Sequence, residues 1–180
     1  MSAELDRFFE PRVLSARAWR LGSVTPLEEW PRLAELDALG GEAAATGRTV
    51  RLEVALSEDD SGAPLLEGEV AVTLRCICQR CLEEMELDLH AQPKLFFGRA
   101  DQLGEAAVAA GFEHCEPAPG ITLRQLLEDE VLLSVPAFPV HERSEDCGAL
   151  AARLAELEPA EGGEKSSGPF AVLAELKRKK

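Results

Sequence analysis

Three cysteines lie within seven residues of this chain and form its strongest chemical signal. Cys76, Cys78 and Cys81 occur in the run Arg-Cys-Ile-Cys-Gln-Arg-Cys that begins at Arg75. A Cys-x-x-Cys pair such as Cys78 and Cys81 can hold one metal ion from a single tight turn, because the turn points both thiolates to the same side. Tetrahedral zinc then requires two further ligands from elsewhere in the chain.

His141 and Cys147 are of the right types to complete such a site. Imidazole and thiolate are both ordinary zinc ligands, so we predict a zinc knuckle held by Cys78, Cys81, His141 and Cys147. Two alternatives stay open, namely inert thiols packed in the fold and a redox-active Cys-x-x-Cys. The redox alternative is disfavoured because the pair does not open a helix after a strand, where a helix dipole would lower a thiol pKa. The fifth cysteine, Cys115, stands apart and is expected to be incidental.

Other catalytic patterns are weak in this sequence. There is no glycine-rich phosphate loop and no Gly-x-Ser-x-Gly elbow, and the three histidines are scattered. The run Glu128, Asp129 and Glu130 could serve as a metal or acid/base site. A solvated helix face is the simpler interpretation of three adjacent acidic residues.

The chain is strongly acidic, but its charged residues are unevenly distributed. The formal net charge is −14. Residues 1–164 carry 14 basic and 32 acidic residues, whereas residues 165–180 carry five basic residues and one acidic residue. Because binding to phosphates needs dense Lys and Arg, the acidic body argues against a protein that coats bare nucleic acid. The basic end is either a solvated tail or a short anchor for RNA or an acidic partner; its candidate contact residues are Lys177, Arg178, Lys179 and Lys180.

Apolar alternation predicts the strands that would position the cysteines. Residues 49–56 alternate cleanly, and further strands are expected at about 65–77 and 83–90, with a short edge strand near 94–98. Short connections favour an antiparallel β-meander or a small barrel-like sheet in an α+β fold. Cys78 and Cys81 then fall at the hairpin tip between the second and third of these strands.

A few helices are expected to pack on this sheet. Residues 11–24 suggest an early strand, and Thr25-Pro26 resembles a helix start, followed after Pro31 by a short helical piece over 33–39. The best helix begins at Thr122, where Thr122-x-x-Gln125 forms a capping box.

The chain divides by composition into three parts. We predict one α+β domain over residues 1–157, a flexible linker over 158–168 and a docking segment over 169–180. In that last segment an apolar stretch containing Phe170 and Leu173 precedes the basic end. A charged N-terminus without an apolar core and the lack of a long apolar run predict a cytoplasmic protein that is not membrane-bound.

Several short motifs occur in a fixed order along the chain. They are Thr25-Pro26 after Gly22, Cys78-Gln79-Arg80-Cys81, the run Leu126–Leu133, Val135-Pro136-x-x-Pro139-Val140-His141, Cys147, and the ending Pro169–Lys179. Together they resemble the bacterial YceD family over nearly the whole sequence. The resemblance marks as signature positions Arg80, Glu128, Asp129, Glu130, Pro136 and Pro139.

Members of that family are known as large ribosomal RNA subunit accumulation proteins. The resemblance therefore implies a non-enzymatic role in the synthesis, processing or stability of 23S rRNA. The implied partners are 23S rRNA or its precursors, reached directly or through ribosomal or assembly proteins, and no small-molecule substrate is implied. Two other hypotheses are a metal-dependent RNA-processing hydrolase that uses the acidic helix, and a structural adaptor that docks through Phe170, Leu173 and Leu176.

Overall fold

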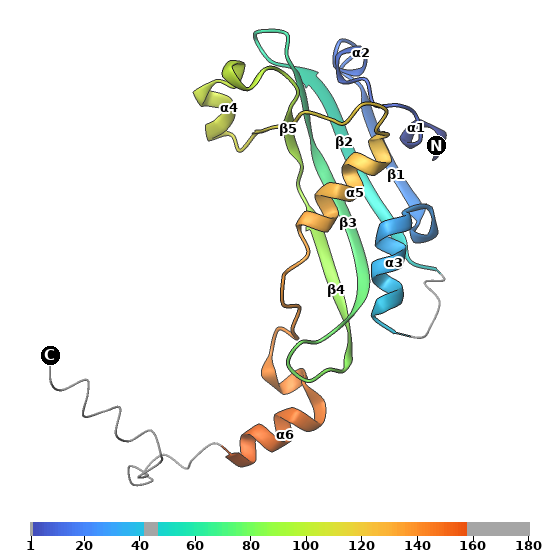
Figure 1. The fold of residues 1–180 in the computed structure, drawn as a ribbon, viewed down its shortest axis with the longest axis vertical. Coiled ribbons are helices and arrows are strands. Elements are labelled where there is room, and N and C mark those ends of the chain that lie inside the picture. The colour runs from blue at the N-terminus through green and yellow to red at the C-terminus, as the bar shows by residue number, and fades with distance from the viewer. Residues whose placement is uncertain (1, 42–46, 158–180) are drawn as a thin grey trace, which may run out of the picture. The chain divides into compact units, whose positions relative to one another are not determined.

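The computed structural model describes residues 2–41 and 47–157. The chain falls into two compact units, Met1–Val140 and His141–Lys180. In the part of the second unit that the structure describes, a short 3-10 turn over Ser144–Asp146 precedes α6 (Gly148–Leu157) (Figure 1). The predicted linker and docking segment lie outside the described residues.

The first unit is built on an open sheet that contains six strands among the described residues. Every pairing is antiparallel except the one between the two shortest strands, β5 and β6. The predicted α+β class with an antiparallel meander is therefore confirmed. The strands are β1 (Arg20–Pro26), β2 (Thr49–Glu58), β3 (Pro64–Ile77), β4 (Glu84–Ala91), β5 (Lys94–Phe96) and β6 (Glu113–His114).

Strand β3 is the long central strand of this sheet. One of its edges pairs with β2 from Pro64 to Val72, and its other edge pairs first with β5 and then with β4. Pro93 separates β5 from β4, and its carbonyl still accepts a hydrogen bond from the N–H of Gly68 at 3.2 Å. A Cβ on Gly68 would lie 2.2 Å from the carbonyl oxygen of Glu53, so the close approach of β2 to β3 requires glycine there.

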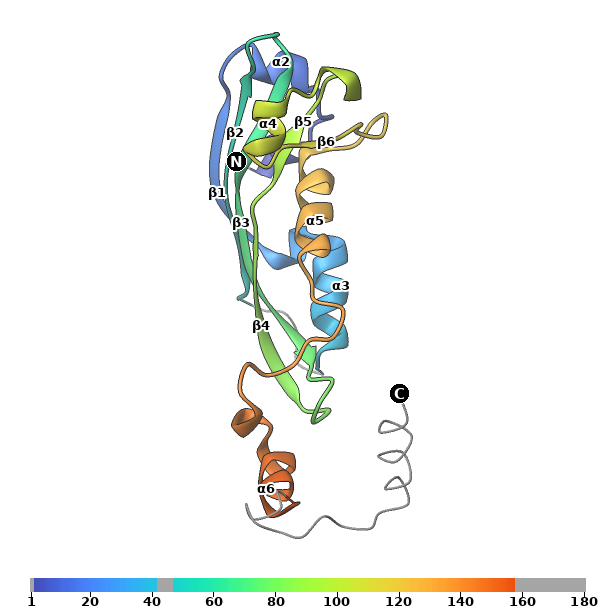
Figure 2. The same cartoon turned by 90° about the vertical axis from the view of Figure 1, so that its left-hand side faces the viewer.

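Two helices, α3 (Pro31–Leu39) and α5 (Leu123–Leu133), cover one face of the sheet (Figure 2). Alternate residues of the strands point to this face, as the period-2 pattern predicted. The buried apolar core there is made from strand, loop and helix residues, among them Trp30, Leu33, Val50, Leu52, Leu66, Val70, Leu74, Leu126, Leu127 and Val131. The opposite face of the sheet is largely polar and exposed.

The N-terminal elements differ from the sequence prediction in two places. After a short α1 (Ser2–Leu5), the segment predicted as an early strand over residues 11–24 begins instead with α2 (Pro11–Ser15), and only Arg20 onward joins the sheet. Thr25 does not begin a helix; it lies in β1, and its Oγ1 accepts a hydrogen bond from the indole N–H of Trp30 at 2.9 Å. The alternating burial of β1 continues through this position, so sheet pairing overrides the local helix-start signal.

The capping box predicted for α5 is confirmed. The backbone N–H of Gln125 donates to Thr122 Oγ1 at 3.2 Å, and Gln125 Oε1 accepts from the N–H of Thr122 at 2.9 Å. The helix ends at Leu133, and a segment of turn and bends follows it. Two of the free N–H groups at the start of the helix are thus satisfied locally.

Candidate metal centre

The Cys78-x-x-Cys81 pair lies at the tip of the β3–β4 hairpin, where the sequence placed it. The N–H of Cys78 donates to the carbonyl of Glu83 at 2.9 Å, and the N–H of Leu82 donates to the carbonyl of Cys78 at 2.8 Å. The backbone N–H of Arg80 points at Cys78 Sγ, 3.4 Å away. Cysteine binds metal ions as the thiolate, and a backbone N–H can donate a hydrogen bond to such a sulfur.

The second unit supplies the other pair of ligand types. His141 Nδ1 lies 3.6 Å from Cys147 Sγ. Cys147 follows the 3-10 turn, where its N–H donates to the carbonyl of Ser144 at 3.1 Å and its own carbonyl accepts from Leu150 at 3.0 Å. Turn and helix backbone therefore fix the position of Cys147 within the second unit.

The four predicted ligands are three cysteines and one histidine, divided between the two units. Cys78 and Cys81 belong to the first unit, and His141 and Cys147 to the second. A Cys₃His set uses every position of tetrahedral zinc, which suits a structural rather than a catalytic metal.

The other two cysteines are outside this group. Burial raises the pKa of the Cys76 thiol, and its neighbour Cys78 raises it further. Burial also raises the pKa of the Cys115 thiol, with added effects from Glu130 and Asp129. Both thiols are therefore held in the protonated form, which is a poor metal ligand and a poor nucleophile.

Glu128 is not part of a solvated acidic face, contrary to the expectation from sequence. Its carboxylate is 1% exposed and accepts hydrogen bonds from the backbone N–H groups of Arg32 and Leu33 at 2.8 and 3.1 Å. The side chain of Arg32 adds a third bond at 3.0 Å. Glu128 thus caps the N-terminus of α3 from another helix, where a negative charge is favoured by the helix dipole.

Glu130, two residues further on, is half-buried. Burial raises the pKa of its carboxyl group, and the charges of Glu113 and Asp129 raise it further. The folded protein therefore binds this proton more tightly than the unfolded chain does. The free energy of unfolding of the wild type therefore rises as the pH falls through the raised pKa of Glu130. Above that pKa the folded protein holds the carboxylate in its disfavoured, ionised form.

Replacing Glu130 by glutamine is expected to stabilise the protein more at about pH 8 than at about pH 5, because glutamine removes only the cost of the charged form. Urea unfolding of both proteins at the two pH values measures the difference. Glu105→Gln, at an exposed position, serves as the control. An equal effect of Glu130→Gln at both pH values would contradict the prediction.

Two of the remaining signature residues, Arg80 and Pro139, lie at or next to the hairpin tip. Arg80 is exposed there, and the carbonyl of Pro139 accepts a hydrogen bond from the N–H of Gln79 at 2.8 Å, which ties the segment after α5 to the tip. Pro136 lies in the segment between α5 and Pro139. The predicted partner-binding residues lie outside the described part of the chain: Phe170, Leu173, Lys177, Arg178, Lys179 and Lys180.

The sequence did not identify Asp37 and Arg48, which organise the edge of β3 near this tip. Asp37 is fully buried and accepts hydrogen bonds from Arg75 through its N–H at 2.7 Å and through Nη2 at 2.9 Å. Arg48 donates to the carbonyl of Thr73 at 3.1 Å and lies 3.5 Å from Asp37. No local motif signals these contacts, because Asp37 and Arg48 reach residues of β3 that are 38 and 25 positions away in the chain.

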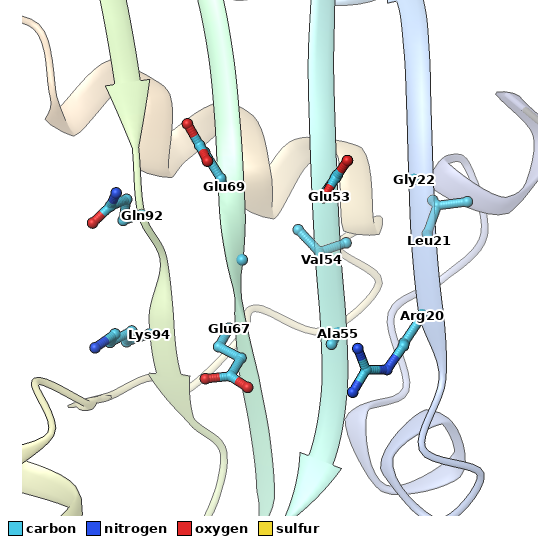
Figure 3. A pocket seen from close by; sticks show the side chains of 11 residues that line it. Arg20, Leu21, Gly22, Glu53, Val54, Ala55, Glu67, Glu69, Gln92 and Lys94 are labelled. Carbon is cyan, nitrogen blue, oxygen red and sulfur yellow. The ribbon is translucent and has the colours of Figure 1, made fainter.

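A shallow hollow of about 500 Å³ lies on the exposed face of the sheet (Figure 3). Glu53 on β2 and Glu69 on β3 are paired in the strand register at one end of the hollow. Arg20 and Lys94 lie towards its other end. The hollow is open, mixes both signs of charge and has no histidine or cysteine in its lining. We assign no chemistry to it.

Comparison with known proteins decides the family. A family model described as "Large ribosomal RNA subunit accumulation protein YceD" matches residues 66–177, more than half of the chain. The chain belongs to the YceD family. All four candidate ligands fall inside the YceD match, whereas β1, β2 and the N-terminal helices precede it.

A curated relative supports the assignment to YceD. The large ribosomal RNA subunit accumulation protein YceD of Haemophilus influenzae is 32% identical over 119 residues, which cover 64% of this chain and 66% of the relative. No solved structure matches the chain. Among the described residues no helix is both long and apolar enough to cross a membrane.

Proposed function

We propose that this protein supports the accumulation of the large ribosomal subunit by acting, without catalysis, in the synthesis, processing or stability of 23S rRNA in the cytoplasm. Membership of the YceD family carries the proposal, since the family is described by that accumulation role. The candidate metal centre would have a structural role at the β3–β4 hairpin tip. It would not be a reactive site, because protein ligands fill all four positions.

The charge distribution limits how the protein can reach rRNA. A body with 14 basic and 32 acidic residues would repel a phosphate backbone over most of its surface. Two routes remain: contact through the basic residues near the C-terminus, or contact through a basic ribosomal or assembly protein that meets the acidic body. Electrostatic complementarity favours the second route for most of the surface.

Crosslinking in cells tests the proposal directly. The full-length protein is expected to recover 23S rRNA or large-subunit precursors, and recovery of neither would overturn the proposed function. Changing Lys177, Arg178, Lys179 and Lys180 to glutamine tests the basic route, and Phe170→Ala is a control for the neighbouring apolar stretch. Loss of the RNA signal only in the charge variant would assign direct contact to the basic end, because each lost phosphate contact weakens RNA binding.

We also propose that Cys78, Cys81, His141 and Cys147 hold one structural zinc ion. The four donor types and the backbone donor on Cys78 support this choice. The hydrolase alternative has no comparable support, since Glu128 uses its carboxylate to cap α3.

A further inference from the structure

Leu82, at the hairpin tip, has an unusual backbone conformation for its residue type. Its φ is +63°, and in the described residues Ala18 is the other non-glycine residue with a positive φ. Such a conformation disfavours a large side chain, and glycine adopts it without penalty. The loop requires it here, because the N–H of Leu82 must reach the carbonyl of Cys78 while Glu83 closes the hairpin.

The Leu82 side chain does not recover this cost by packing in the core. It is 73% exposed, so it excludes little apolar surface from water within the unit. A strained backbone combined with an exposed apolar side chain suggests that the side chain serves a contact outside the unit.

Phe138 provides a second exposed apolar side chain close to the tip in the same unit. It is 78% exposed and directly precedes Pro139, whose carbonyl accepts the hydrogen bond from Gln79. Leu82 and Phe138 therefore extend from two segments that are joined by one backbone hydrogen bond. Large exposed apolar side chains held on a fixed frame are typical anchors of protein interfaces.

The surroundings of these anchors are acidic. Glu83 and Glu84 follow Leu82 and are exposed, whereas Arg80 is the one basic residue between Cys78 and Glu84. Exposed Glu86 and Asp88 continue along β4, where Glu86 pairs with Arg48. We call Leu82, Phe138, Glu83 and Glu84 the tip surface. Its charge opposes a nucleic-acid backbone and complements a lysine- or arginine-rich polypeptide.

We propose that the tip surface binds a basic polypeptide segment that carries an apolar anchor. This inference rests on the proposed function, because it supplies the protein-mediated route from an acidic body to the ribosomal subunit. The apolar anchor of the partner covers Leu82 and Phe138, and its cationic side chains face Glu83 and Glu84. The acidic rim then sets the rate and salt dependence of association more than its final affinity.

Leu82→Gly separates a binding role from a structural one. Glycine relieves the backbone strain, so the denaturation midpoint should stay the same or rise, whereas binding should weaken about tenfold through loss of an anchor. The probe is a fluorescent peptide that alternates lysine and leucine, titrated onto the full chain and followed by anisotropy at two salt concentrations. Phe138→Ser should weaken binding similarly, and Phe8→Ser, at a 72% exposed position remote in sequence, is the matched control.

Three results would overturn the inference. They are a lower midpoint for Leu82→Gly, peptide binding that is equal in the tip variants and the control, and a single-stranded RNA oligonucleotide that binds more tightly than the peptide and depends on Leu82. The peptide titration is independent of rRNA recovery from cells. A failure here with rRNA still recovered would reject the tip surface alone, whereas loss of rRNA recovery would reject the proposed function.

Discussion

Replacing Asp37 by alanine is expected to lower the free energy of unfolding by about 3–5 kcal/mol, because it leaves a buried arginine without its charge partner. Asp37 is fully buried, and the side chain of Arg75 is 9% exposed. The guanidinium of Arg75 and its backbone N–H both donate to this one carboxylate. The variant therefore loses a charge pair and a main-chain acceptor together.

The position of Asp37 in the sheet explains why the expected loss is large. The pairing of β3 with β2 ends at Val72, so the following residues of β3 have no strand on that edge. The carboxylate of Asp37 satisfies the N–H of Arg75 there, and Arg48 satisfies the carbonyl of Thr73. These two side chains take the place of the missing strand and join α3 to the sheet, and buried main-chain groups without such partners are costly.

Equilibrium unfolding in urea measures this effect. Asp101→Ala is the matched control, since Asp101 forms an exposed pair with Arg99 and should change stability by at most about 1 kcal/mol. Asp37→Asn keeps the shape and one acceptor, so its loss should be intermediate. A loss below about 1 kcal/mol for Asp37→Ala would show that water replaces the carboxylate without cost, which contradicts the structural role.

The sequence predicted features that depend on neighbouring residues and missed those that depend on distant ones. The alternation of apolar and polar residues predicted the strands around Cys78, and the capping box at Thr122 predicted the start of α5. Both signals are local in sequence. The prediction that Thr25 begins a helix was wrong, because pairing of β1 with β2 determines its conformation. The role of Glu128 was missed because it depends on the N-terminus of α3, 95 residues away in the chain.

The purified protein is expected to contain about one zinc ion per chain, and Cys78→Ser should remove most of it. The first unit has its own apolar core, so metal loss should not unfold the sheet. It should instead lower hydrogen-exchange protection at the hairpin tip, beginning with the N–H groups of Cys78 and Leu82. Because the ligands bind as thiolates and neutral imidazole, acid should release the ion.

Matched cysteine variants separate the zinc site from inert thiols. Cys76→Ser and Cys115→Ser should keep the zinc, because burial raises the pKa of both thiols and neither belongs to the ligand group. Cys81→Ser and Cys147→Ser should behave like Cys78→Ser, since each removes one of the four ligands of a closed tetrahedral site. Zinc analysis by mass spectrometry and exchange at the tip check this pattern. Metal-free wild-type protein whose tip is as protected as that of zinc-supplemented protein would contradict the site, because a structural ion must stabilise the residues that bind it.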